Sequence, residues 1–167
     1  MPPDISIRFA GIEDINIIGF LAQQIWPATY SEILSEDQLT YMMNLFYSPA
    51  ALKDQIIEKK HVFVIVEENG SPIAFASYST TDQQGVYKLH KIYIMPNRQG
   101  IGLGKYIIDF VIENIQPLRA IALQLNVNRN NKARYFYERH GFLIIREENI
   151  DIGNDYFMND YVMELKL

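Results

Sequence analysis

The pattern of apolar and polar residues near the N-terminus predicts one strand followed by three helices. Residues Ile5–Phe9 alternate between the two kinds, as a half-buried strand does. The stretch 12–25 has apolar residues at helical spacing, and we expect this helix to end near Trp26-Pro27. Ser35 precedes Glu-Asp-Gln and Ser48 precedes a proline, so each predicts the start of a further helix.

The rest of the chain is predicted to form mostly strands. A β-branched run at 61–66 and its partner strand at 73–78 flank Asn69-Gly70, a pair typical of a tight hairpin turn. Four later strands are expected at Val86–Ile94, Ile121–Val127, Phe142–Ile150 and Tyr156–Leu165. Helices are expected at Leu103–Ile115 and Asn130–His140. This order predicts a mixed α/β sheet with helices on both of its faces.

Composition narrows the class of protein. The 167 residues are 49% hydrophobic and 21% charged, which suits a single globular domain covering 1–167. The chain has no cysteine and its three histidines lack metal-ligand spacing, so we expect no disulfide and no metal site. A net charge of -5 argues against nucleic-acid binding. The sequence shows no membrane span and no secretory signal, so we expect a cytoplasmic protein with no membrane partner.

A glycine-rich segment between a strand and a helix carries the clearest candidate chemistry. Residues 99–104 read Gln-Gly-Ile-Gly-Leu-Gly. Alternate glycines let a backbone approach an anion closely, and the free N–H groups at a helix start favour a phosphate. The third glycine of a dinucleotide fingerprint would fall on Lys105, and the first glycine of a Walker A loop would fall on Gln99, so neither motif fits. We expect a phosphate of another ligand here; the alternative is a tight connection without a ligand.

Two segments together resemble the GNAT N-acetyltransferase superfamily. Residues 99–104 match its Q/R-x-x-G-x-G/A acetyl-CoA motif, and residues 92–96 match the strand and proline that precede that motif. Residues 130–142 match N-x-x-A-x-x-F-Y-E-x-x-G-F. Residues 26–30 and 156–163 are more loosely similar to the spermidine/spermine acetyltransferases of the bacterial Pai type. The resemblance implies a mixed, mostly antiparallel central sheet of about seven strands, flanked by helices on both faces, and acetyl-CoA-dependent N-acetyltransferase activity.

The resemblance also implies roles for single residues. Backbone groups of Ile92 and Ile94 would hydrogen-bond the pantetheine arm of acetyl-CoA, and Asn130 would contact this arm or cap a helix. The residues expected to bind the cofactor are Ile92, Tyr93, Ile94, Gln99, Gly100, Ile101, Gly102, Leu103, Gly104, Lys105, Asn130, Lys132 and Tyr137. Tyr137 would also give a proton to the leaving thiolate, with plain aromatic core as the alternative.

The base that takes a proton from the acceptor amine is less clearly marked. Many family members have a glutamate on the strand before the phosphate loop, whereas residues 87–92 contain no carboxylate. His90 is the titratable residue nearest to that position and is the candidate base; the alternative is a strand histidine bonded to a neighbour. Because the chain has no cysteine and no Ser-His-Asp spacing, we expect direct transfer in a ternary complex.

The acceptor would bind on the opposite side of the acetyl group, against aromatic residues. Trp26, Tyr30 and Tyr41 are the expected substrate-binding residues, with core packing as the alternative. The expected acceptor is a primary amine of a small molecule, with a polyamine as one candidate. A protein N-terminus, an amino acid or an aminoglycoside are alternatives, as is a module that binds acetyl-CoA without catalysis. A homodimer is a further expectation that the sequence leaves open.

Overall fold

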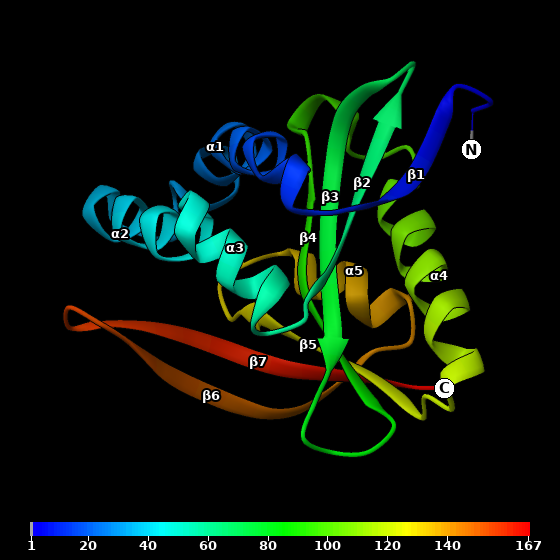
Figure 1. The fold of residues 1–167 in the computed structure, drawn as a ribbon. Helices are drawn as coiled ribbons and strands as arrows, with labels where there is room; N and C mark the ends of the chain where they lie inside the picture. Colours follow the sequence, from blue (N-terminus) through cyan, green and yellow to red (C-terminus); the bar gives the residue numbers. More distant parts are fainter. Residues whose placement is uncertain (1) are drawn as a thin grey trace.

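The computed structural model describes residues 2–167, which form one sheet with helices on both faces (Figure 1). The first elements are β1 (Ile5–Ala10), a short 3-10 helix η1 (Ile12–Asp14), α1 (Ile15–Tyr30), α2 (Glu36–Tyr47) and α3 (Pro49–Ile57). The middle elements are β2 (Val62–Glu68), β3 (Ser71–Thr80), β4 (Val86–Ile94), η2 (Pro96–Arg98), α4 (Leu103–Ile115) and η3 (Gln116–Leu118). The last elements are β5 (Ala122–Asn128), α5 (Ala133–Arg139), β6 (Leu143–Gly153) and β7 (Tyr156–Lys166).

The sheet has seven strands in the order β1-β2-β3-β4-β5-β7-β6. All neighbouring strands are antiparallel except β4 and β5, which are parallel. The prediction of a mixed, mostly antiparallel sheet flanked by helices is therefore confirmed. Within residues 2–167, none of the helices combines enough length with enough apolar character to cross a membrane.

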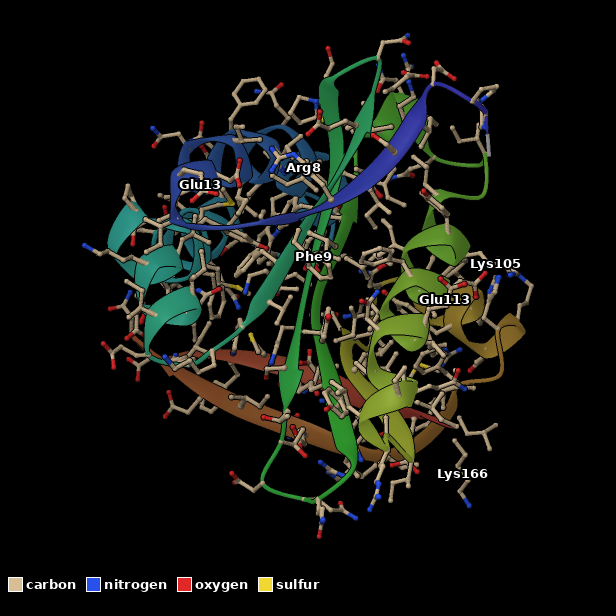
Figure 2. The ribbon with its side chains drawn as sticks, turned by 45° about the vertical axis from the view of Figure 1, so that its right-hand side comes forward. Arg8, Phe9, Glu13, Lys105, Glu113 and Lys166 are labelled. Carbon is tan, nitrogen blue, oxygen red and sulfur yellow. The ribbon has the colours of Figure 1, made fainter. Side chains whose placement is uncertain are left out.

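Each face of the sheet carries its own apolar core. Strand β2 shows the division, because successive side chains of a strand point to opposite faces. Val64 and Val66 pack into the core beneath α4, whereas Phe63 and Ile65 pack beneath α1–α3. Figure 1 shows these two groups of helices on opposite sides of the sheet. At the edge of the sheet, Phe9 of β1 lies toward α4 (Figure 2), where its ring centroid is 5.4 Å from that of Phe110.

Helix α1 is longer than the sequence predicts. The predicted end near Trp26-Pro27 is wrong, because the helix continues to Tyr30. Pro27 stands in the last turns, where its missing N–H removes one hydrogen bond. Trp26 and Tyr30 are 4% and 9% exposed on the buried side of this helix. One hydrogen bond contributes about 1 kcal/mol net to stability. Burying these two aromatic rings stabilises the extra turn by more than the bond that is lost at Pro27.

Helix α5 is shorter than the sequence predicts. It covers Ala133–Arg139 rather than 130–140. The side chain of Asn131 accepts the backbone N–H of Ala133 at 2.9 Å, which ends the preceding loop and starts the helix there. Lys132 stands at the N-cap position without a side-chain cap, so Asn130 does not cap α5.

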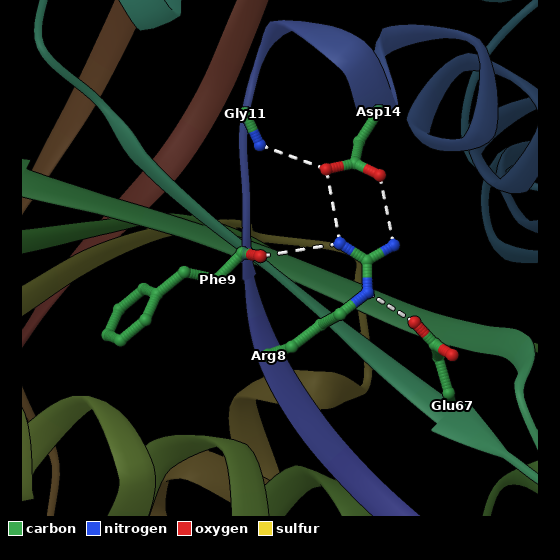
Figure 3. A network of polar contacts seen from close by, with 5 residues as sticks. All are labelled: Arg8, Phe9, Gly11, Asp14 and Glu67. Atoms are coloured by element: carbon green, nitrogen blue, oxygen red, sulfur yellow. Dashed lines mark hydrogen bonds and ion pairs between the residues drawn. The ribbon is translucent and has the colours of Figure 1, made fainter.

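An ion-pair network fixes the start of α1 to the edge of the sheet (Figure 3). Arg8 of β1 donates to the two carboxylate oxygens of Asp14 at 3.1 and 2.9 Å, and it also pairs with Glu67 of β2. The carboxylate of Asp14 accepts the backbone N–H of Gly11 at 3.0 Å as well. The hydrogen bonds from Arg8 hold the pKa of Asp14 below its ordinary value although Asp14 is buried.

We expect Asp14→Asn to lower the free energy of unfolding by about 1–2 kcal/mol at neutral pH, because the bidentate pairing with Arg8 needs a carboxylate. A carboxyl group whose pKa is lowered by folding stabilises the protein above its unfolded pKa of about 3.9 and loses this effect as the pH falls through the folded pKa. The difference between variant and wild type should therefore shrink below about pH 4.

Urea unfolding at neutral and acidic pH measures this difference. Asp82→Asn is a suitable control because Asp82 is exposed in a turn. Equal stability of Asp14→Asn and wild type at neutral pH would contradict the proposed role of the network.

Candidate active site

A cavity of about 750 Å³ opens where β4 and β5 separate. These parallel strands pair only over Val86–Leu89 and Ala122–Leu125. From Lys91 to Ile94, β4 is paired with β3 on one side, and no strand of the described chain pairs with its other edge. Residues of this edge line the cavity. An unpaired strand edge offers N–H and C=O groups to an extended ligand that contains amides.

The glycine-rich loop stands at one end of this cavity. Gly100 and Gly102 have φ angles of +82° and +90°, in the left-handed region that favours glycine. The first backbone bond of α4 runs from the N–H of Tyr106 to the carbonyl of Gly102 at 3.1 Å. Across the described residues, no backbone N–H from Gln99 to Lys105 donates to another backbone group. These free N–H groups and the helix dipole create a site for an anion.

Two cationic residues belong to the cavity that this loop borders. Lys132 and Arg139 both line the cavity, one just before α5 and one in its last turn. Lys105 also belongs to the loop, but its side chain is exposed and pairs with Asp109 on the outer face of α4. The side chain of Gln99 bonds the carbonyl of Ile94 at 3.3 Å and so ties the loop to the end of β4. The positive charges of Lys132 and Arg139 suit an anionic ligand in this cavity.

The third glycine of the loop has a different role from the other two. A Cβ atom on Gly104 would lie 2.7 Å from the Cζ atom of Phe136. Phe136 lines the cavity, and its carbonyl oxygen lies 2.7 Å from Nδ1 of His140. Gly104 therefore lets the ring of α5 pack directly on the first turn of α4.

Tyr137 lies on α5 and lines the same cavity. Its ring packs against Phe136 and Phe142, with centroid distances of 5.4 and 5.7 Å. Burial raises the pKa of Tyr137, so the hydroxyl keeps its proton at neutral pH. Ala133, one turn earlier on the helix, also lines the cavity and leaves room beside the phenol. The neighbouring Tyr135 is 49% exposed, since three consecutive rings cannot share one face of a helix.

Two further tyrosines form the opposite wall. Tyr30 at the end of α1 and Tyr93 on β4 both line the cavity, and their hydroxyl groups lie 2.9 Å apart. Burial raises the pKa of both phenols, so both are neutral at neutral pH. Trp26 lies behind this wall with its ring centroid 4.7 Å from that of Tyr30, and its indole N–H donates to the hydroxyl of Tyr47 at 3.1 Å. Trp26 is not among the lining residues found within 2–167.

Tyr41 lies away from the cavity. Its hydroxyl donates to the carbonyl oxygen of Ile152 at 2.6 Å, and its ring centroid is 5.3 Å from that of Tyr156. These contacts join α2 to the hairpin of β6 and β7. Of the three residues expected to bind the acceptor, the structure thus brings Tyr30 to the cavity wall, with Trp26 behind it and Tyr41 at a separate contact.

His90 lines the cavity from the middle of β4. Its Nε2 atom lies 2.7 Å from Oγ of Ser79, and its ring stacks on that of His61 with the centroids 3.9 Å apart. Burial, together with the positive charges of His61 and Lys88, lowers the pKa of His90 to about 2. A group with so low a pKa is a weak base at neutral pH, so this environment does not favour His90 as the proton acceptor.

Sequence reasoning missed several polar residues of the cavity. Lys91, Asn126 and Asn131 line it as well. Asn126 belongs to a strand in which polar residues alternate with leucine and valine. This pattern could have marked Asn126 as facing the side of the sheet opposite to α4. The other two stand at no fixed position of a motif that points to a site. Over residues 2–167, no group of three or more histidine, aspartate or glutamate side chains gathers in a way that could hold a metal ion.

Comparison with known proteins relates the chain to acetyltransferases. The family model of the Acetyltransferase (GNAT) family matches residues 16–142. The uncharacterized N-acetyltransferase YuaI of Bacillus subtilis (strain 168) is 28% identical over 152 residues, which are 89% of this chain and 86% of YuaI. The spermidine N(1)-acetyltransferase of Thermoplasma acidophilum is 24% identical over 159 residues, 92% of this chain and 95% of that protein. The solved structure of the PaiA N-acetyltransferase from Thermoplasma acidophilum in complex with coenzyme A has the same fold, with a TM-score of 0.82, 23% identity and coverage of 98% and 99% of the two chains.

The contact between Gly104 and Phe136 predicts opposite effects of alanine at two helical glycines. Gly104→Ala should lower the free energy of unfolding by about 1–3 kcal/mol, because the added methyl group overlaps the ring. Gly19→Ala should raise it by about 0.5–1 kcal/mol, because its Cβ atom meets only the carbonyl of Tyr47 at 3.7 Å and alanine favours the helix. Chemical denaturation of both variants measures the two shifts. Stabilisation by Gly104→Ala would show that the ring does not restrict this position.

Proposed function

Because the chain belongs to the acetyltransferase (GNAT) family, we propose that this N-acetyltransferase moves the acetyl group of acetyl-CoA directly to a primary amine of a small molecule. One observation carries the proposal: an unpaired strand edge, a run of free loop amides and a buried, protonated phenol all face one cavity. These are the groups needed to hold an amide-containing arm, a pyrophosphate and a leaving thiolate.

The coenzyme would bind along the cavity from the loop to the strand. Free N–H groups from Gln99 to Lys105 would hold the pyrophosphate, and Lys132 and Arg139 would balance its charge. Backbone groups at the free edge of β4, including those of Ile92 and Ile94, would bond the amides of the pantetheine arm. The N–H of Ile94 would then polarise the thioester carbonyl. The PaiA structure contains coenzyme A, which supports this choice of ligand.

Tyr137 would supply the proton that the leaving thiolate needs. A thiol with a pKa of about 8.5 is a stronger acid than a phenol with a pKa of about 10, so a complete proton transfer to a free thiolate is uphill by roughly 2 kcal/mol in water. Burial raises the pKa of Tyr137 further, but the same burial disfavours the thiolate anion. The transfer is therefore favourable only as the C–S bond breaks, with phenol and sulfur in hydrogen-bond contact.

The amine is expected to attack the thioester itself. The chain has no cysteine that could carry the acetyl group, so transfer through a ternary complex and a tetrahedral intermediate is the simplest route. The tetrahedral intermediate would then expel coenzyme A and leave the acetylated amine.

A polyamine is the acceptor that we propose to test first. Glu32 at the cavity provides a carboxylate for a second ammonium group, and Tyr30 and Tyr93 provide aromatic surface and hydroxyl groups. The relative from Thermoplasma acidophilum is named a spermidine N(1)-acetyltransferase, which also supports this class. Amino acids, aminoglycosides and peptide N-termini are the other acceptors in the test.

Calorimetry with acetyl-CoA and a thiol-release assay over these amines test the function. We expect heat of binding for the wild type, and its loss in Gly102→Val, because a β-branched side chain cannot keep a φ of +90° and blocks the approach of a phosphate. Gly70→Val is the matched control, since Gly70 has a φ of +79° in a hairpin turn away from the cavity. No heat with folded wild type, or binding retained by Gly102→Val, would contradict the assignment of the loop. Binding without thiol release from any amine would favour a non-catalytic module.

Tyr137→Phe should lower kcat by about 100-fold or more and leave the dissociation constant of acetyl-CoA within about threefold, because only the proton-donating hydroxyl is lost. Tyr135→Phe is the matched control on the same helix, since Tyr135 is exposed. Steady-state kinetics and calorimetry measure the two quantities. Unchanged turnover of Tyr137→Phe would remove this phenol from the mechanism.

A further inference from the structure

Asn126 stands at the point where β4 and β5 separate. The pairing of the two strands ends at Leu125, and Asn126 is the next residue of β5 and lines the cavity. Leu125 and Val127 pack into the core beneath α4, so Asn126 points to the other face of the sheet. Tyr30 and Tyr93 pack into the core on that other face and line the same cavity. Asn126 is therefore on the side that the acceptor of the proposed function would occupy.

Two carboxylates hold the side-chain amide of Asn126 in one orientation. Its Nδ2 atom donates to Oε2 of Glu148 on β6 and to Oδ2 of Asp160 on β7, both at 3.2 Å. Burial acts to raise the pKa of Glu148, but hydrogen bonds from Asn126 and Arg146 lower it below its ordinary value. Glu148 is thus an ionised carboxylate at neutral pH, and such a group can only accept hydrogen bonds. The NH2 group of the amide must therefore be the part that faces the carboxylates.

The oxygen of the same amide is free to bind a ligand. Among residues 2–167, no side chain or backbone N–H donates to Oδ1 of Asn126, and this atom is not shut off from solvent. An amide oxygen has two lone pairs and cannot donate. Asn126 therefore offers the cavity a hydrogen-bond acceptor in a fixed orientation.

Asp160 brings a negative charge close to this acceptor. Its side chain is 6% exposed and forms no ion pair within the described chain. Burial raises the pKa of Asp160, while Asn126 and Lys88 act against this rise. Burial and, to a smaller extent, Asp160 raise the pKa of Tyr30, so the charge of Asp160 acts at the wall of the cavity. A buried carboxylate without a cation is unfavourable, so this part of the cavity favours a cationic ligand.

On the basis of the proposed function, we propose that Oδ1 of Asn126 accepts a hydrogen bond from the reacting nitrogen of the acceptor amine. Glu148 and Asp160 are positioning residues, because they fix the amide and favour the positive charge of the ammonium form. The amide oxygen takes up no proton at neutral pH, so Asn126 binds and orients the nitrogen and is not the base. The acceptor class that fits is an amine that is cationic at neutral pH and has an N–H on the reacting nitrogen.

The same substitution at two amides of β5 tests the role of Asn126. Asn126→Leu should lower kcat/KM for the amine by about tenfold or more, because a charge-assisted hydrogen bond is lost, and should leave the dissociation constant of acetyl-CoA within about threefold. Gln124→Leu is the matched control, since Gln124 lies on the same face of β5 and donates to Glu164 at 2.7 Å but does not line the cavity. Thiol release and calorimetry measure the two quantities.

Three results of this comparison would overturn the proposal. The first is an unchanged kcat/KM in Asn126→Leu. The second is an equal loss in Gln124→Leu, which would show that any amide of this face matters only for the sheet. The third is weaker binding of acetyl-CoA by Asn126→Leu with no effect on the amine, which would place the amide on the coenzyme.

A second variant separates ligand binding from folding. Leucine leaves Asp160 without a donor, which is destabilising. Asn126→Lys instead keeps donors for Glu148 and Asp160 but has no acceptor for a ligand. We expect it to bind acetyl-CoA as the wild type does and to lose kcat/KM for the amine by about tenfold or more. Turnover of Asn126→Lys close to that of the wild type would show that only the contact with the carboxylates matters.

A double-mutant cycle tests the positioning role of Asp160. Asp160→Ala should raise KM for the amine more than it lowers kcat, because it weakens binding of the cation. The rise in KM should be smaller when Asn126 is already leucine, since part of the effect of Asp160 passes through the amide. An equal rise in both backgrounds would contradict the positioning of Asn126 by Asp160.

A measurement without turnover keeps this inference separate from the proposed function. The amine with the highest kcat/KM is titrated calorimetrically into protein saturated with coenzyme A, where no acetyl group can move. Its dissociation constant should rise by about tenfold or more in Asn126→Leu and stay within about twofold in Gln124→Leu. A wild type that releases no thiol with any amine contradicts the proposed function and this inference together. A wild type that turns over and whose affinity for the amine is unchanged in Asn126→Leu contradicts the role of Asn126 alone.

Discussion

The early end of pairing between β4 and β5 is the constraint from which the rest of the site follows. The two strands part after Leu89 and Leu125, and the space between them becomes the cavity. If the pairing continued, the edge groups of both strands would be bonded within the sheet. Buried backbone groups without partners are costly, so the open edge is stable only where solvent or a ligand bonds it. The start of α4 and the phenol of Tyr137 on α5 both border this cavity.

The bulge at His90 makes a second adjustment at the same point of the strand. It directs the side chains of His90 and Lys91 toward helices α1–α3. A buried ionisable group there is unfavourable unless it is paired or neutral. Gln55 and two aromatic rings partly compensate Lys91. Gln55 is itself held by the carbonyl of Phe46 at 2.9 Å, so the ends of α2 and α3 are tied to the environment of one lysine on β4. Helices α2 and α3 therefore contribute to the electrostatic environment of a buried lysine as well as to packing.

Local patterns predicted most of the fold, and the errors lie where distant contacts decide. The ranges Val86–Ile94 and Leu103–Ile115 agree with β4 and α4, because alternation and helical spacing are both clear there. The end of α1 was placed too early because the burial of Tyr30 is invisible to a rule about proline. The bulge in β4 also escaped prediction, since the sequence of one strand does not reveal how many residues oppose it.

The two halves of the cavity also differ in how far local sequence patterns predict them. The half that we propose for the cofactor is formed mainly by backbone groups of one continuous segment, residues 99–105, so a local motif is enough to predict it. Even there, the three glycines are needed for different reasons. Gly100 and Gly102 adopt positive φ angles, whereas Gly104 leaves room for the ring of Phe136. The half that we propose for the acceptor combines side chains of α1, β4 and β5. Their chemistry depends on burial and on neighbours more than 30 residues away, so a family whose members share the loop can change acceptor and base without changing the motif.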